Sequence, residues 1–160
     1  MSEQRHIIQL DPDVSLCTGC SGCEVVCGLI NYGKTGPGAR RIFVHKDSVQ
    51  MMHTVYACQH CEDHPCFDAC PTKIGAMEID SDTNVVFVND DKCIGCGLCV
   101  KACPYTPKRI QLGSEKKAMK CDLCRGREGG PACIEHCQVI CLAMSDEPTS
   151  NTEGGENNGK

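Results

Sequence analysis

The sequence predicts an α+β fold in which short helices and hairpins surround metal-binding cysteines instead of an aromatic core. The chain of 160 residues contains 17 cysteines, a density typical of a cross-linked or metal-bound scaffold. It has no Trp, three Phe and three Tyr, so few large side chains are available to fill a core. All but one of the cysteines fall into four groups of four, which is the main repeat of the sequence.

Disulfides are the first alternative for so many cysteines, and the N-terminus argues against them. Residues 1–6 contain no basic stretch followed by an apolar run, so no secretory signal is visible and we expect a cytoplasmic protein. Without an oxidising compartment, dense cysteines indicate metal or redox centres. No run approaches the roughly 18 apolar residues of a membrane span, so we expect no direct span.

Short regular elements are predicted between the cysteine groups. Residues 6–10 favour a short strand, and residues 76–89 favour a hairpin, because apolar residues alternate on both sides of a Ser-Asp-Thr-Asn turn. A short helix is predicted over 115–120, with Ser114 as its N-cap. Residues 144–160 have no apolar side chain after Met144 and are predicted to form a polar, disordered tail.

Each cysteine group begins Cys-x-x-Cys and ends Cys-x-x-x-Cys. Three cysteines at this spacing can wrap three corners of a [4Fe-4S] cubane, and in the bacterial run Cys-x2-Cys-x2-Cys-x3-Cys-Pro the fourth cysteine ligates the other cluster of a pair. The third group fits this run and ends at Pro104, and the second ends at Pro71 after two extra residues. The groups are Cys17, Cys20, Cys23, Cys27; Cys58, Cys61, Cys66, Cys70; Cys93, Cys96, Cys99, Cys103; and Cys121, Cys124, Cys133, Cys137.

The two proline-terminated groups face one another across the predicted hairpin, so we expect them to exchange fourth ligands. The two groups without the proline are left to pair with each other, which nests one pair inside the other. The expected ligand sets are Cys17, Cys20, Cys23 and Cys137 (cluster A); Cys121, Cys124, Cys133 and Cys27 (cluster B); Cys58, Cys61, Cys66 and Cys103 (cluster C); and Cys93, Cys96, Cys99 and Cys70 (cluster D).

The fourth group leaves a second kind of metal site open. Its third gap is eight residues long, and taken alone the group could be half of a zinc ribbon. Structural zinc, however, is usually held by paired Cys-x2–4-Cys units, whereas this group ends in the same Cys-x3-Cys as the other three. A cluster site is therefore the favoured interpretation.

Histidines and the seventeenth cysteine give no further cofactor site. No Cys-x-x-Cys-His occurs, which excludes covalent haem attachment, and Rieske centres need two His in place of two Cys. His60, His64 and His136 adjoin predicted ligands and are expected to be supporting or surface groups. Cys141 lies four residues after Cys137 and is expected to be a buried thiol, not a fifth ligand.

On these four groups the sequence resembles the four-cluster ferredoxin-like electron-transfer subunits of molybdenum and tungsten oxidoreductases, such as dimethyl sulfoxide reductase, formate dehydrogenase and nitrate reductase. It is also similar to smaller versions found with hydrogenases, carbon monoxide dehydrogenases and tungsten aldehyde oxidoreductases. The resemblance covers about residues 5–143 and implies two ferredoxin-like two-cluster halves nested in one chain. The inner half would span about 50–112, and the outer half about 5–49 plus 113–143. Every ligand position is Cys, so no [3Fe-4S] centre is expected.

The resemblance implies a wire of four [4Fe-4S] clusters with no catalytic residues of its own. The implied partner is a tungsten- or molybdenum-pterin catalytic subunit, and the aldehyde oxidoreductase type is favoured because the chain is short and unanchored. A flavin subunit or a ferredoxin would be the electron acceptor or donor. The alternatives are a hydrogenase, carbon monoxide dehydrogenase or formate dehydrogenase complex, or a free shuttle ferredoxin.

The charge pattern excludes nucleic acid as a partner. The formal net charge of −5 counts every thiol as neutral, and four oxidised tetrathiolate clusters would make it about −13. Half of all Lys and Arg residues nevertheless lie between Lys101 and Arg127. This basic segment either compensates the anionic clusters or docks onto an acidic partner surface, and the two roles are compatible.

Overall fold

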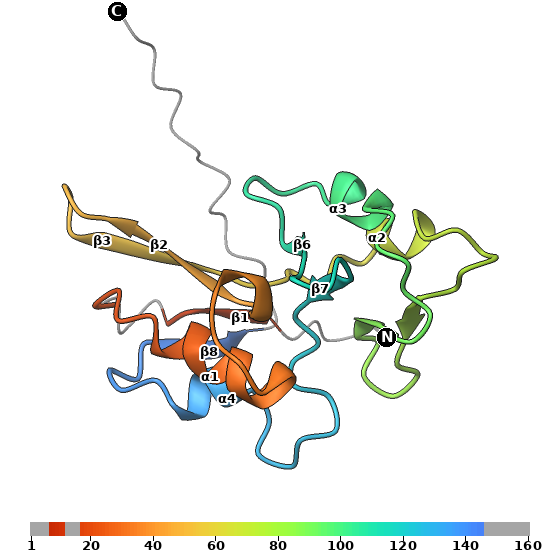
Figure 1. The fold of residues 1–160 in the computed structure, drawn as a ribbon. Helices are drawn as coiled ribbons and strands as arrows, with labels where there is room; N and C mark the ends of the chain where they lie inside the picture. Colours follow the sequence, from red (N-terminus) through yellow and green to blue (C-terminus); the bar gives the residue numbers. More distant parts are fainter. Residues whose placement is uncertain (1–6, 12–16, 146–160) are drawn as a thin grey trace, which may run out of the picture.

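The computed structural model describes residues 7–11 and 17–145, and Figure 1 shows short helices and paired strands joined by long loops. In this part of the chain the strands pair as two-stranded antiparallel sheets, β1 with β8, β2 with β3, β4 with β5 and β6 with β7. The predicted α+β class with short helices and hairpins is therefore confirmed. The elements are β1 Ile7–Leu10, α1 Gly22–Tyr32, the 3-10 helix η1 Pro37–Ala39, β2 Phe43–Asp47, β3 Met52–Tyr56, α2 Pro65–Asp68, β4 Met77–Ile79, β5 Val86–Val88, α3 Leu98–Ala102, β6 Ile110–Leu112, β7 Ala118–Lys120, α4 Ala132–Glu135 and β8 Leu142–Ser145.

Two predicted elements are found where local sequence placed them. The first strand is β1, and the hairpin of residues 76–89 is β4 with β5, in which Met77 lies opposite Val88. The hairpin turn forms because the Asp80 carboxylate accepts hydrogen bonds from the backbone N–H groups of Asp82 and Thr83, each at 3.1 Å. An Asp that caps its own turn in this way is a common local signal.

The predicted helix over 115–120 is wrong, because residues 118–120 form strand β7. Lys116 adopts a left-handed backbone with φ of 60°, and the Gly113 N–H donates to the carbonyl of Lys117 at 2.8 Å, so the chain reverses directly after β6. Ser114 does not cap a helix, since its N–H bonds to the carbonyl of Gly38. All three residues of β7 are buried, and tertiary packing therefore outweighs the helical propensity of the segment.

The first and third cysteine groups end differently for a simple steric reason. Cys103 is followed by a proline, which cannot continue a helix, and α3 ends just before it. Cys27 is followed by Gly28, and α1 continues for more than a further turn until Gly33 caps it with a left-handed backbone. A Cβ at Gly28 would lie 2.5 Å from the carbonyl oxygen of Lys34, so this position needs glycine for the loop to pack there.

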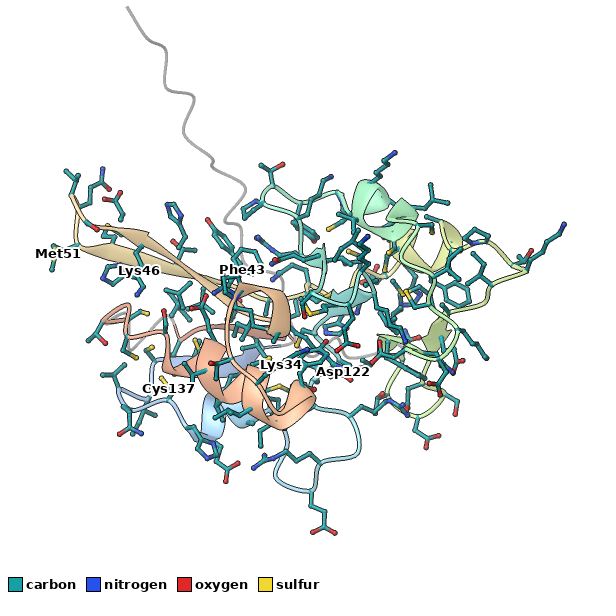
Figure 2. All side chains as sticks on the ribbon, viewed as in Figure 1. Lys34, Phe43, Lys46, Met51, Asp122 and Cys137 are labelled. Atoms are coloured by element: carbon teal, nitrogen blue, oxygen red, sulfur yellow. The ribbon has the colours of Figure 1, made fainter. Side chains whose placement is uncertain are left out.

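Buried side chains in the described residues gather into two clusters. One contains Ile8, Ile42 and Leu142 with cysteines of the first, second and fourth groups, and hairpin β2–β3 packs against it through Val44 and Val55. Figures 1 and 2 show this hairpin extending from the rest of the fold, with Met51 at its tip. The second contains residues from β4 to β7 with Cys66 and Cys99.

The observed hairpins cross the expected boundaries between the two halves. Residue 50 lies in the turn between β2 and β3, and residue 113 lies in the turn between β6 and β7. Strand β8 runs through Ser145, which the sequence assigned to the tail, because it pairs with β1. The remainder of that tail, 146–160, lies outside the described residues. Among the residues described, none of the helices has the length and apolar character needed to cross a bilayer.

Candidate metal centres

The clearest site is a hollow lined by Cys58, Cys61, Cys66 and Cys103, which come from the second and third cysteine groups. It encloses about 350 Å³, counted with its mouth. Two of its sulfurs accept backbone hydrogen bonds at 3.4 Å, Cys58 from the His60 N–H and Cys103 from the Arg109 N–H. Donors aimed at sulfur favour the thiolate form, which is the form that binds metal.

A second hollow, of about 340 Å³, is lined by the four cysteines Cys70, Cys93, Cys96 and Cys99. The Ala118 N–H of β7 donates to the Cys93 sulfur at 3.4 Å. Most of the other lining residues are apolar and come from strands β4 and β5, the loop before β4, and β7. The second and third groups thus each contribute three cysteines to one hollow and one cysteine to the other. That these cysteines ligate clusters C and D stays a prediction.

A third hollow, of about 330 Å³, is lined by Cys17, Cys20, Cys23 and Cys137, with Cys141 beside them. Cys141 is 2% exposed, its sulfur lies 3.6 Å from that of Cys137, and its N–H donates to Cys137 at 3.4 Å. Burial acts to raise the pKa of both thiols, but at Cys137 the hydrogen bonds from Cys141, Val139 and Leu142 together outweigh burial, so the pKa of Cys137 is lowered. The pKa of Cys141 is raised to about 12, which suits a neutral thiol that supports its neighbour.

The remaining set comes from helices α1 and α4 and from the loop after β7, and it consists of Cys27, Cys133, Cys121 and Cys124. Cys27, Cys121 and Cys133 belong to the same buried cluster. The charge of Cys124 acts on Cys27 and Cys133, so the fourth thiol is near as well. The Cys27 sulfur accepts the Arg41 N–H at 3.3 Å.

Because several of these thiols are buried, their protonated form is strongly favoured over the free thiolate. Desolvation raises the pKa of Cys23, Cys66 and Cys133 to about 12 and that of Cys99 to about 11. Without metal such thiols stay protonated at neutral pH. A metal that replaces the protons removes the cost of burying thiolates, so the sites fit metal-bound sulfur. None of the 17 cysteines forms a disulfide.

Geometry separates clusters from single metal ions. Within the described residues, no three Cys, His, Asp or Glu side chains are close enough together to hold one ion. Zinc requires four ligands at about 2.0–2.3 Å from a single centre. A [4Fe-4S] cubane takes one thiolate at each of four separate irons, so its ligands surround a hollow. The observed arrangement fits cubanes, and the fourth group does not form a compact zinc site.

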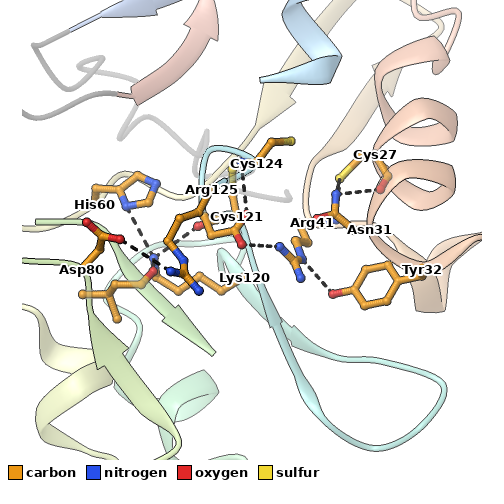
Figure 3. A network of polar contacts seen from close by, with 12 residues as sticks. Cys27, Asn31, Tyr32, Arg41, His60, Asp80, Lys120, Cys121, Cys124 and Arg125 are labelled. Atoms are coloured by element: carbon orange, nitrogen blue, oxygen red, sulfur yellow. Dashed lines mark hydrogen bonds and ion pairs between the residues drawn. The ribbon is translucent and has the colours of Figure 1, made fainter. Parts of the chain in front are cut away.

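Three cations close to the thiols were not singled out by sequence. Lys120 and Arg109 are buried beside the first hollow, and Arg109 lies 4.2 Å from the ring centroid of Tyr56. Arg41 forms a 2.7 Å ion pair with Asp122, and Figure 3 shows its hydrogen bond to the hydroxyl of Tyr32. A basic residue directly before a cysteine group, as in Ala-Met-Lys-Cys, is the one local signal that marks Lys120. Of the histidines, His60 and His64 line the first hollow and His136 the third.

Comparison with known proteins decides the family. Residues 49–147 match the profile of the 4Fe-4S dicluster domain, and residues 14–33 match that of a 4Fe-4S binding domain. The chain belongs to the 4Fe-4S dicluster domain family. This dicluster-family chain is 42% identical over 137 residues to the polyferredoxin-like subunit of aliphatic sulfonate oxidoreductase from Pyrococcus furiosus, covering 84% of this chain and 73% of that protein.

Two relatives of the dicluster-family chain come from Escherichia coli K12. Protein NrfC is 36% identical over 150 residues, covering 88% of this chain and 66% of NrfC. Electron transport protein HydN is 33% identical over 153 residues, covering 84% of this chain and 85% of HydN. The dicluster-family chain is therefore an iron–sulfur protein that binds [4Fe-4S] clusters and acts in electron transfer as a non-catalytic subunit.

Proposed function

We propose that the chain holds four [4Fe-4S] clusters on sixteen of its cysteines and carries single electrons between an oxidoreductase and a redox partner. The observation that carries this proposal is the grouping of thiols from two distant segments around each of three hollows, together with a fourth set in which Cys27, Cys121 and Cys133 share one buried cluster. When bound, such clusters supply one-electron exchange over a wide range of potentials. The proposed ligand sets, called sets A to D, are those expected for clusters A to D from the sequence, and Cys141 is not among the proposed ligands.

Interactions between the thiol sets support one order of the sets in space. Cys23 of set A is among the charges acting on Cys133 of set B, and Cys58 of set C acts on Cys121 of set B. Sets C and D share a buried cluster through Cys66 and Cys99. We propose that the sets form a row in the order A, B, C, D. Electrons would then enter at one end of the row and leave at the other.

We propose that the chain consists of an outer and a nested inner two-cluster half, with boundaries at the ends of the observed hairpins instead of near residues 50 and 113. The outer half would hold sets A and B and include hairpin β2–β3, since Val44 and Val55 pack in its core. The inner half would hold sets C and D and include β6 with β7, since Ile110 and Ala118 pack with Cys66 and Cys99. The boundaries then lie near residues 57 and 120, and nesting remains the proposed topology of the two halves.

The partner is proposed to be a catalytic subunit that carries a tungsten- or molybdenum-pterin. The name of the Pyrococcus furiosus relative describes it as a polyferredoxin-like subunit of an oxidoreductase, which supports a catalytic partner for this chain as well. An aldehyde oxidoreductase-type subunit is the form proposed from the resemblance. A flavin subunit or a ferredoxin would exchange electrons at the other end of the row.

The test is the subunit and metal inventory of the native complex. A tagged full-length chain, purified without oxygen from its own organism, should retain a second subunit that contains tungsten or molybdenum by mass spectrometry. The chain separated from that subunit should accept electrons but convert no organic substrate. A catalytic subunit containing neither metal would overturn the pterin proposal alone. A chain that elutes by itself with full iron would instead indicate a free shuttle ferredoxin.

A further inference from the structure

Lys120 is a buried cation at the junction of two proposed centres. It ends strand β7, directly before Cys121 of set B, and it lines the hollow of set C together with Cys66. Its side chain is buried, with the whole residue only 3% exposed. Lysine is almost never buried to this extent unless its charge is compensated.

Hydrogen bonds hold the Lys120 ammonium in place, as Figure 3 shows. Its Nζ lies 2.6 Å from the carbonyl oxygen of Val86, 3.3 Å from that of Cys121 and 3.5 Å from Nδ1 of His60. Three acceptors match the three protons of an ammonium group. The bond to Val86 also ties β7 to β5.

No carboxylate supplies the counter-charge among the residues that the structure describes. Arg41, a partly buried cation near set B, is already paired with Asp122 at 2.7 Å. Arg109 contacts the hollow of set C alone, where its guanidinium covers the Tyr56 ring. Lys120 therefore differs from both, because it adjoins two thiol sets and forms no ion pair with a carboxylate in the described chain.

We infer that Lys120 is the internal counter-charge shared by sets B and C, and that it raises the reduction potentials of the clusters held there. The inference rests on the proposed ligand sets. Reduction adds one negative charge to a cluster, and a fixed positive charge that is buried beside the cluster favours the reduced form. The effect should be larger at set C, whose hollow Lys120 lines, than at set B, where it contacts only a backbone carbonyl.

The experiment is a redox titration of the full-length, cluster-loaded chain, followed by electron paramagnetic resonance. Lys120→Met keeps the length of the side chain and removes its charge. We expect two of the four potentials to become more negative, one of them by enough to lower the reduced-to-oxidised ratio about tenfold, equal to about 59 mV for one electron. The other two potentials should stay at the wild-type values.

The matched control is Lys101→Met. This lysine lies on helix α3 between two proposed ligands of the third group, but it is exposed to solvent. The same loss of charge should leave all four potentials unchanged, because water and salt screen an exposed charge. Unchanged potentials in a fully loaded Lys120→Met variant would overturn the inference, and so would equal shifts in the two variants.

A second variant is needed in case Lys120→Met fails to bind its full set of clusters. If Lys120→Met binds too little iron, Lys120→Arg should restore full loading, because the guanidinium keeps the charge. Low iron in Lys120→Arg as well would show that shape and not charge matters here, and would contradict the inference. Low iron in the wild-type chain would instead count against the four-cluster proposal itself, so the two failures are distinguishable.

Discussion

Cys103 tests the exchange of fourth ligands between the two inner cysteine groups. It lines the hollow of Cys58, Cys61 and Cys66, although in sequence it ends the third group. We expect Cys103→Ala to lose or alter the cluster bound in that hollow. That cluster would account for about four of the sixteen irons expected per chain. Iron analysis and electron paramagnetic resonance should show this, and Cys141→Ala should retain full iron.

Two reference variants identify the centre that is lost. Cys61→Ala damages the centre of the second group, and Cys96→Ala damages that of the third group. The spectrum of Cys103→Ala should match that of Cys61→Ala. A match with Cys96→Ala would mean that each group keeps its own fourth ligand.

Arg41 stabilises the loop that carries Cys121 and Cys124. Burial acts to lower the pKa of Arg41, but attraction to Asp122 and Tyr32 outweighs it, so the guanidinium stays charged. Arg41→Met would leave the Asp122 carboxylate without its partner and should cost about 3 kcal/mol of stability. The denaturation midpoint of the loaded protein measures this loss.

The matched control for Arg41 is an exposed ion pair. Lys34 and Glu115 are 3.0 Å apart, with side chains 46% and 71% exposed. Lys34→Met should shift the midpoint much less than Arg41→Met does, because solvent screens a surface pair. Equal midpoints for Arg41→Met and Lys34→Met would contradict the role assigned to Arg41.

The sequence shows which cysteines form groups, but it shows little of what surrounds them. The two proline-terminated groups were expected to exchange fourth ligands across the hairpin, and cysteines of both groups line the first two hollows. Which cysteines ligate each cluster stays a prediction. The burial of Lys120 could not be predicted, because its acceptors come from Val86 and His60, far away in the chain. A lysine in a basic segment looks the same in sequence whether it is buried or solvated.

At the scale of elements, the loop of the third group depends on its contact with the β6–β7 turn. Gly95 lies between Cys93 and Cys96 with φ of +70°, and a Cβ there would overlap the backbone carbonyl of Lys116. We expect Gly95→Ala to cost about 1–3 kcal/mol beyond the strain of a left-handed alanine. The denaturation midpoint and the iron content after purification measure the effect.

Gly126→Ala is the control for backbone strain alone. Gly126 has φ of +82°, but a Cβ there would meet nothing within 4 Å. It should therefore lose only about 1–2 kcal/mol, the cost of a left-handed alanine. If the two variants were equally stable, the packing of the loop against the turn would not matter.

The elements that sequence predicted correctly are those determined locally. Hairpin β4–β5 follows from alternating apolar residues and the turn formed by Asp80. The pairing of β1 with β8 joins residues about 135 apart, and no local pattern indicates it. The helix predicted over strand β7 is wrong, because the conformation of β7 is set by its partner β6 and by the turn at Lys116.

For the whole molecule, the proposed centres should serve as much of the core. Cysteines make up a large part of both buried clusters, and few large side chains replace them. Removing iron with a chelator should therefore unfold the chain, because binding and folding energies are linked. Circular dichroism should show loss of structure as the iron-dependent absorbance falls. A chain that keeps its spectrum after full iron removal would contradict this expectation.

The iron and acid-labile sulfide content of the full-length chain tests the four-cluster proposal most directly. The measurement uses protein purified without oxygen, with metals counted by mass spectrometry and sulfide by acid release. Four cubanes predict about sixteen irons and about sixteen sulfides per chain, with no zinc. About twelve irons and twelve sulfides with one zinc would contradict the proposal and would place zinc on Cys121, Cys124, Cys133 and their partner.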